Sequence, residues 1–150
     1  MPEDTSPVVA TQACLDRVHA REHPMCVVCS PHNPNGLKLK FKVHPDGSVV
    51  AVFDCLAALQ SYPNVLHGGI ICAILDSAMV NALFAIDIVA VTATLEVRYR
   101  APTAIGRFAM VRAWIESDNA YPLYLLRAEL VQDGKVTVEA KAKFLVRDAA

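Results

Sequence analysis

The sequence lacks the features of several large protein classes. It has no block of like charge, and its 14 Lys plus Arg against 15 Asp plus Glu give a formal net charge of -1. This balance offers no dedicated surface for nucleic acid or for an anionic membrane. The apolar stretch 70–91 contains Asp76, Asn81 and Asp87, whereas a membrane-spanning helix needs about 20 residues with few or no charges. We therefore expect no nucleic-acid partner and no membrane span.

Signals for export and for common nucleotide cofactors are also missing. Residues 1–9 are acidic and contain proline, without the basic and apolar regions of a secretory signal. We therefore expect a cytoplasmic protein whose five cysteines are reduced thiols rather than disulfides. Neither a P-loop nor a G-x-G-x-x-G fingerprint occurs, and we expect no cofactor.

The patterns that are present indicate a single domain with an N-terminal extension. Apolar residues make up 54% of the 150 residues, enough to bury a sizeable core. Residues 1–35 contain five of the nine prolines and one short helical candidate at 11–21, which predicts a cover segment. Residues 36–150 carry the regular hydrophobic patterns and form the predicted main domain.

In the main domain, apolar periodicity predicts two strands, one long helix and four further strands. The alternation that begins at Leu37 predicts the first strand, and Asp133-Gly134 is a strong hairpin signal. The expected strands are 37–43, 48–54, 91–99, 107–117, 121–132 and 135–146, and the expected helix is 67–84. A nearly all-apolar helix and about six antiparallel strands satisfy each other if the sheet curls around the helix. We therefore predict an α+β fold of the hotdog type, whose open sheet edges favour a homodimer at least.

The start of the long helix carries the first candidate site residues. His67-Gly68-Gly69 stands directly before it, so the free N–H groups of the first turn, at the positive end of the helix dipole, face an approaching ligand. Asp76 lies in the apolar middle of the helix with no cation three or four residues away. A carboxylate placed there is costly unless a partner or a catalytic site needs it. The alternative is that Asp76 hydrogen-bonds a loop N–H or faces water at the helix edge.

The spacing of Gly68 and Asp76 has a consequence for assembly. Eight residues at 1.5 Å each separate them by about 12 Å along the helix. An oxyanion donor must lie within about 3 Å of the developing charge, so one carbonyl cannot contact both residues of a single chain. If both serve one reaction, two antiparallel helices across a two-fold axis must bring Gly68 of one subunit near Asp76 of the other. The spacing therefore predicts an obligate dimer with two composite sites.

Several stretches resemble the hotdog-fold acyl-CoA thioesterases of the PaaI-like type. They are Tyr-Pro-Asn-Val-Leu-His-Gly-Gly-Ile-Ile at 62–71, Leu-Asp-Ser-Ala-Met at 75–79, and Val-Thr-Ala-Thr-Leu-Glu-Val-Arg-Tyr-Arg-Ala-Pro at 91–102. The run 26–37, with two cysteines and Asn-Pro-Asn-Gly-Leu, is similar to a pattern in one branch of that superfamily. The resemblance covers about residues 25–147.

The resemblance implies hydrolysis of an acyl-CoA thioester to a free acid and CoA. By position, the N–H of Gly68, helped by that of Gly69, would polarise the thioester carbonyl. Asp76 of the partner subunit would be the general base for water or the nucleophile itself. His67 would shape the glycine turn or bind near the thioester, and Thr92 would hold the attacking water.

The expected substrate contacts are less sharply defined. The resemblance implies binding by Ser61 and Asn64, although the loop reads Gln60-Ser61 where the family often has Asn or Gly. Arg98 is one of several cations on polar strand faces that could meet CoA phosphates. We expect an acyl-CoA substrate and a homodimer that assembles further as a dimer of dimers, a homotetramer.

Two other functions remain open at this point. The same fold could hold an acyl-CoA or lipid-like ligand without turning it over, although a pure binder gains nothing from a desolvated acid. A hotdog hydratase or dehydratase would place a His and an Asp together in the loop after the helix. Asp87 is there, but no histidine follows it in the chain.

The N-terminal segment contains a competing motif, H-x3-H-x2-C-x2-C, with four possible metal ligands within eleven residues. A closed zinc site usually takes its two ligand pairs from separate turns, whereas Pro24 here interrupts one short segment, and the resemblance supplies no metal. We therefore assign no metal site and interpret the motif as packing cysteines and surface histidines. We likewise interpret Cys55 and Cys72 as core residues. The motif residues are His19, His23, Cys26 and Cys29.

Overall fold

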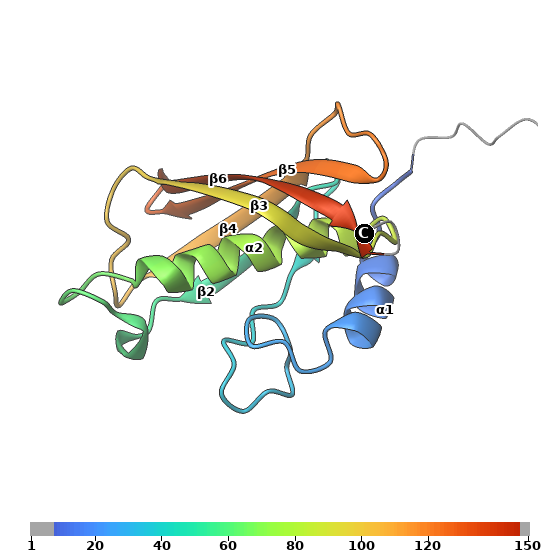
Figure 1. Cartoon of the computed structure of the whole chain (residues 1–150). Coiled ribbons are helices and arrows are strands. Elements are labelled where there is room, and N and C mark those ends of the chain that lie inside the picture. Colours follow the sequence, from blue (N-terminus) through green and yellow to red (C-terminus); the bar gives the residue numbers. More distant parts are fainter. Residues whose placement is uncertain (1–7, 148–150) are drawn as a thin grey trace, which may run out of the picture.

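The computed structural model describes residues 8–147, so the first seven residues of the predicted cover segment and the last three of the predicted main domain lie outside it. Six strands form one antiparallel sheet in the order β1-β2-β4-β5-β6-β3. Helix α2 lies across one face of the sheet, and α1 lies at the end of α2 (Figure 1). No helix within residues 8–147 is long and apolar enough to cross a membrane. The elements are α1 (Gln12–Glu22), β1 (Lys42–Val43), β2 (Val49–Asp54), a 3-10 turn η1 (Ala57–Leu59), α2 (Gly68–Phe84), β3 (Ala90–Tyr99), β4 (Phe108–Ile115), β5 (Leu123–Gln132) and β6 (Lys135–Val146).

The predicted hotdog class is confirmed: the sheet curls around one long helix, and α1 covers the end of that helix. Helix α2 begins at Gly68, with His67 as its N-cap. The core lies between α2 and the concave face of the sheet, where fully buried helix residues meet fully buried strand residues. Burial of each such side chain contributes about 1.5–3 kcal/mol relative to exposure. The largest of these residues include Ile74, Leu75, Met79, Val111, Leu126, Leu130 and Phe144.

The exposed part of α2 is confined to its N-terminal half. Every residue from Ser77 to Ala85 is buried, because the sheet and α1 enclose the C-terminal half of the helix. Nearer the N-terminus a stripe at helical spacing remains at least partly accessible, formed by Gly69, Cys72, Ala73 and Asp76. The open stripe contains two of the predicted site residues.

The predicted strand at 37–43 is much shorter in the structure. Only Lys42 and Val43 pair with β2. Lys38 has a positive φ of 56°, and the N–H groups of Leu37 and Leu39 donate to the carbonyls of residues 27 and 28 rather than to β2. The alternation is still expressed as burial, since Leu39 and Phe41 are buried, but the segment packs on the N-terminal cover instead of extending the sheet.

Strand β3 forms one edge of the sheet and pairs only with β6. Its ladder shifts register between Thr92 and Thr94, which is a β-bulge with one extra residue. Side chains alternate along a regular strand, so Thr92 and Tyr99, an odd number of residues apart, would point to opposite faces. The bulge reverses this, and both side chains reach α2.

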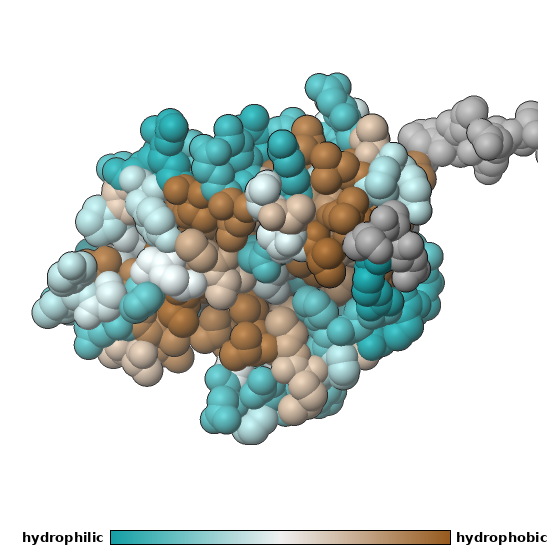
Figure 2. All heavy atoms as spheres, in the orientation of Figure 1, coloured by the Kyte–Doolittle hydropathy of each residue, from teal (hydrophilic) through white to brown (hydrophobic). Residues whose placement is uncertain are grey.

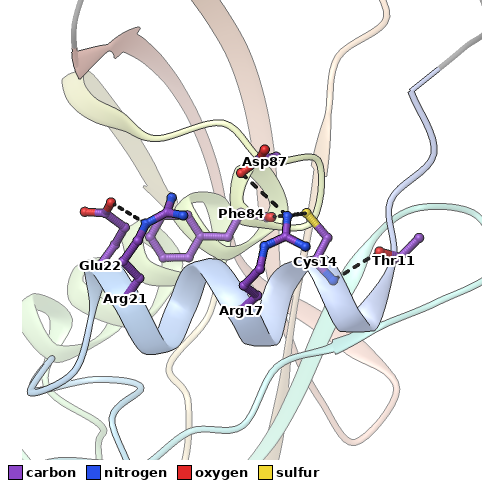
Figure 3. Close-up of polar contacts among 7 residues, drawn as sticks. All are labelled: Thr11, Cys14, Arg17, Arg21, Glu22, Phe84 and Asp87. Atoms are coloured by element: carbon purple, nitrogen blue, oxygen red, sulfur yellow. Dashed lines mark hydrogen bonds and ion pairs between the residues drawn. The ribbon is translucent and has the colours of Figure 1, made fainter.

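The N-terminal helix is fastened to the main domain by contacts at both of its ends, and Figure 3 shows those that Cys14 and Arg17 make with Phe84 and Asp87. Thr11 caps α1 by accepting a hydrogen bond from the Cys14 N–H, and the Cys14 thiol donates to the Phe84 carbonyl at 3.3 Å. Arg17 lies 3.9 Å from Asp87. At the other end, Glu22 accepts from Arg147 at 2.8 Å, which joins α1 to the residue after β6.

Candidate active site

The turn at the start of α2 presents a free backbone N–H at Gly68. The Nδ1 atom of His67 accepts the Gly69 N–H at 2.8 Å, so a neutral His67 ring carries its proton on Nε2. The His67 carbonyl accepts from Ile71. Among residues 8–147 no acceptor lies within hydrogen-bond distance of the Gly68 N–H, which stands at the positive end of the α2 dipole. Gly68, rather than Gly69, is the donor open to a ligand.

Tyr99 holds the same turn from the side of β3. Its hydroxyl donates to the Gly68 carbonyl at 2.6 Å and lies 3.0 Å from the Cys72 sulfur. Burial, aided by Cys72, raises the pKa of Tyr99 to about 12, so the hydroxyl stays protonated at neutral pH. A Cβ on Gly68 would come within 3.3–3.5 Å of the Tyr99 ring and hydroxyl, so the close approach favours glycine. The expectation that Cys72 is a core residue is therefore wrong, because it is only partly buried and lies beside this turn.

Asp76 is held by Thr92. The Thr92 hydroxyl donates to one carboxylate oxygen of Asp76 at 2.6 Å, a short charge-assisted hydrogen bond. The hydrogen-bond partner is therefore a hydroxyl on β3 rather than the loop N–H of the alternative interpretation, and the Asp76 side chain remains partly exposed. No second hydrogen bond to Asp76 occurs within the described part of the chain. One oxygen is thus anchored while the partly exposed carboxylate keeps the other free.

The pairs Tyr99–Gly68 and Thr92–Asp76 lie at different points along the contact between β3 and α2. Tyr99 contacts the first residue of α2 and Thr92 contacts its middle, because β3 runs alongside α2 in the opposite direction (Figure 1). Gly68 and Asp76 remain about 12 Å apart along the same helix. A single chain therefore does not bring the free N–H and the carboxylate to one reacting carbon.

The predicted substrate residues Ser61 and Asn64 lie in an exposed loop just before the turn. The Ser61 N–H donates to the Val65 carbonyl, and the Asn64 N–H donates to the side chain of Gln60. Asn64 has a φ of 66°, which asparagine tolerates better than most residues. Hydrogen bonds within the loop hold it together, and neither the Ser61 nor the Asn64 side chain hydrogen-bonds to residues 67–69 in this structure.

An open, largely apolar hollow of about 270 Å³ lies beside the turn. The size and lining suit a small apolar group. Its walls come from η1 and from the first turn of α2, so it adjoins the His67 ring. The lining residues are Ala58, Leu59, Gln60, His67, Gly69 and Ile70.

Arg98 lies on the other side of β3. Because Tyr99 faces α2, its neighbour Arg98 faces the outer surface of the sheet. It lines a shallow depression of about 230 Å³ that also contains Glu139 and Lys141. Within one chain the structure does not bring Arg98 to the turn or to Asp76.

Sequence reasoning missed Tyr99 as a site residue. The pattern at 91–99 shows it only as one apolar position among several, and its role depends on how β3 meets α2. The available signal was glycine at 68, since a residue without Cβ indicates close approach by another group.

The sheet wrapped around α2, with a free helix N-terminus and an acid on its open stripe, defines a hotdog protein. The sequence model of the thioesterase superfamily matches residues 63–117, from the loop before the turn through β4. The predicted resemblance to the PaaI-like hotdog thioesterases is therefore confirmed. No curated protein matches the sequence.

Solved structures agree with this fold. Protein RHA08564, a thioesterase superfamily protein, is 24% identical with a TM-score of 0.74 over 79% of this chain and 61% of its own length, so this chain spans less than two thirds of it. The E. coli PaaI protein of the phenylacetic acid degradation operon is 18% identical, with a TM-score of 0.67 over 73% of this chain and 80% of its own. A hypothetical thioesterase of Streptococcus pneumoniae TIGR4, solved with coenzyme A, is 15% identical, with a TM-score of 0.66 over 72% and 84% of the two chains. At these identities the likeness establishes the fold.

Proposed function

We propose that this protein is an acyl-CoA thioesterase that hydrolyses a thioester to a carboxylic acid and CoA. The observation that carries the proposal is the pairing of a free Gly68 N–H at the start of α2 with a carboxylate, Asp76, anchored by Thr92 on the open stripe of the same helix. The match to the thioesterase superfamily and the coenzyme A held by the S. pneumoniae relative support the substrate class.

The chemistry needs one donor and one base. The Gly68 N–H and the α2 dipole stabilise the negative charge that develops on the thioester oxygen. Asp76 of the partner subunit takes a proton from water through its free oxygen, while the water oxygen bonds to the carbonyl carbon. The carbon–sulfur bond then breaks, and CoA leaves as a thiolate that is protonated. If Asp76 attacks the carbon directly, water hydrolyses the resulting anhydride instead.

A dimer completes the site. We propose that two α2 helices lie antiparallel across a two-fold axis, so that Gly68 of one subunit faces Asp76 of the other. The surface that this requires is apolar, and Figure 2 shows apolar side chains gathered where α2 and β3 lie in Figure 1. The unpaired edge of β3, where Val91 is 47% exposed, continues it. Dimers of this kind pair again as a homotetramer in the proposal.

The roles of the remaining residues follow from their positions. His67 shapes the turn, because its ring occupies the Gly69 N–H. The loop with Ser61 and Asn64 borders the acyl hollow, and Arg98 on the outer sheet face meets the phosphates of CoA bound by a neighbouring subunit.

Replacement of Asp76 by asparagine tests the function. Thiol release from a panel of short, medium and aryl acyl-CoAs should fall by roughly 10²-fold in Asp76→Asn, the lower part of what a general base contributes. Asp87→Asn is the matched control, because Asp87 is an exposed acid just beyond the end of α2. Equal turnover in wild type and Asp76→Asn would remove Asp76 from the mechanism. Stoichiometric acyl-CoA binding without any thiol release by the wild type would instead favour a non-catalytic binding protein.

A further inference from the structure

A compact group of nitrogen and sulfur ligands lies at the end of α1, away from the residues assigned to hydrolysis. The ligand atoms of His23, Cys26 and Cys29 all lie within 4.8 Å of one another, and His23 Nδ1 is 3.5 Å from Cys29 Sγ. None of the three side chains is fully exposed, and Cys29 is buried. The interpretation of the histidines as surface residues is therefore wrong, since His23 packs edge-on against Phe84 at 4.9 Å between ring centroids.

His19 offers a fourth possible ligand beside this group. It precedes His23 by one helical turn, and the two rings lie 6.2 Å apart. The Nε2 atom of His19 is buried and has no hydrogen-bond partner. An unpartnered buried ring nitrogen costs free energy unless something binds it.

The chain geometry removes the objection raised by Pro24. The Cys26 N–H donates to the His23 carbonyl at 3.4 Å across a turn at Pro24 and Met25. The Ser30 hydroxyl donates to the Pro24 carbonyl at 2.6 Å, which folds the segment with the two cysteines back toward the helix end. The histidine pair thus comes from α1 and the cysteine pair from a separate turn. This division between two elements is the usual arrangement of closed zinc sites.

Both sulfur atoms already receive hydrogen bonds of the kind that support metal thiolates. The Val28 N–H donates to Cys26 Sγ at 3.4 Å, within the cysteine turn itself. The buried Asn81 side chain on α2 donates to Cys29 Sγ at 3.7 Å. Outer-shell donors of this type orient the ligands of a bound metal.

We propose that His19, His23, Cys26 and Cys29 bind one zinc ion in a closed, tetrahedral structural site. Two nitrogens and two sulfurs suit zinc, with ligand distances of about 2.0–2.3 Å and hence separations between ligands of roughly 3.4–3.8 Å. The ligand atoms of His23, Cys26 and Cys29, now within 4.8 Å of one another, need to approach by about 1 Å to reach this geometry, and the His19 ring, 6.2 Å from that of His23, must move toward them. Each thiol that binds loses its proton to solvent, and no oxidant is required. The ion joins α1 and the cysteine turn, which Asn81 in turn connects to α2.

Metal content and cobalt binding test the site directly. Protein purified without a metal-affinity step should contain about one zinc per chain by mass spectrometry of the metal. Metal-free, reduced protein should bind Co²⁺ with the absorption of cobalt–thiolate bonds and a tetrahedral ligand field. Cys26→Ser and Cys29→Ser should lose both signals. His19→Ala should weaken Co²⁺ binding by about tenfold or more, at least as much as the loss of an outer-shell partner.

Two variants serve as matched controls and should retain full binding. Cys14→Ser removes a thiol of the same helix that instead bonds the Phe84 carbonyl, as seen in Figure 3, and His44→Ala removes an exposed histidine. Because a serine variant can fail to fold, wild-type protein decides the matter independently. A folded, reduced wild type that holds no zinc and binds no Co²⁺ would overturn the proposal, as would a Cys26–Cys29 disulfide in protein trapped by alkylation at lysis. Unchanged Co²⁺ affinity in His19→Ala would overturn the assignment of the fourth ligand.

Discussion

The Thr92 hydroxyl fixes the orientation of the Asp76 carboxylate. The hydroxyl occupies one oxygen at 2.6 Å, which fixes the plane of the carboxylate and leaves the other oxygen accessible. A general base must be held within hydrogen-bond reach of the water that it activates, so its orientation matters as much as its basicity. Thr92 is thus a positioning residue in the proposed mechanism, and the water-binding role suggested by the family pattern passes to the free oxygen of Asp76.

Replacement of Thr92 by valine isolates this role. Thr92→Val keeps the shape of the side chain but removes the donor, and kcat for acyl-CoA hydrolysis should fall by roughly tenfold with little change in KM. Thr92→Ser, which retains the hydroxyl, should restore most of the rate. Thr94→Val is the control, because Thr94 is exposed on the same strand. If Thr92→Val turns over as fast as the wild type, the hydrogen bond does not position the base.

The sequence correctly predicts the helices and strands whose apolar residues recur with a clear period. Helix α2 and strand β6 have nearly the expected boundaries. The helix is apolar around most of its circumference and the strand along one face, so the ends of these patterns mark the ends of the elements. The segment from Leu37 to Phe41 shows the limit of that reasoning. Its alternation correctly indicates buried side chains, but the choice of hydrogen-bond partner depends on the distant residues 27 and 28.

The candidate site was predictable only in part for the same reason. His67, Gly68 and Asp76 stand out locally, through a glycine turn and an unpaired acid on an apolar helix. The contact between Thr92 and Asp76, and that between Tyr99 and Gly68, requires a bulge that adds one residue to β3. The alternation of apolar residues along β3 does not indicate the bulge, because the Thr-Ala-Thr sequence at 92–94 fits either register.

Docking of α1 on the end of β6 should depend on pH through Glu22. The hydrogen bond from Arg147, followed by that from Arg21, lowers the pKa of Glu22 below its ordinary value of about 4.3. A carboxylate with a lowered native pKa stabilises the fold above its unfolded pKa, and this contribution is lost as the pH falls through the native value. Wild type should therefore be more resistant to urea than Glu22→Gln at pH 7.

The difference between these two proteins should shrink as the pH is lowered below about 4. Denaturation midpoints at a series of pH values measure it. Asp16→Asn provides the control, since Asp16 is an exposed acid on α1 that accepts only from Gln12 of its own helix. A gap between wild type and Glu22→Gln that stays constant down to pH 3 would show that the charge of Glu22 does not hold α1 in place.

In a single chain, the two groups of the proposed reaction, the Gly68 N–H and the Asp76 carboxylate, lie at opposite ends of an open surface. The stripe of Gly69, Cys72, Ala73 and Asp76 and the free edge of β3 both lack a covering element within residues 8–147. A symmetric dimer that covers them contains two identical sites, each with a donor from one subunit and a base from the other. Two different defects, one in each subunit, would then leave one of the two sites intact.

Mixing two inactive variants tests this division. Gly68→Pro removes the donor N–H, and proline is well accepted at the first position of a helix, where His67 already has the extended φ and ψ that proline requires before it. Gly68→Ala adds the same Cβ near Tyr99 but keeps the N–H, so the comparison of the two variants separates the loss of the donor from crowding.

Gly68→Pro and Asp76→Asn should each be nearly inactive alone. Unfolded together and refolded, they should recover about a quarter of wild-type activity, because half of the dimers are mixed and each mixed dimer has one intact site of two. If mixed dimers form, as mass spectrometry would show, and no activity returns, then Gly68 and Asp76 do not act on one thioester from opposite subunits.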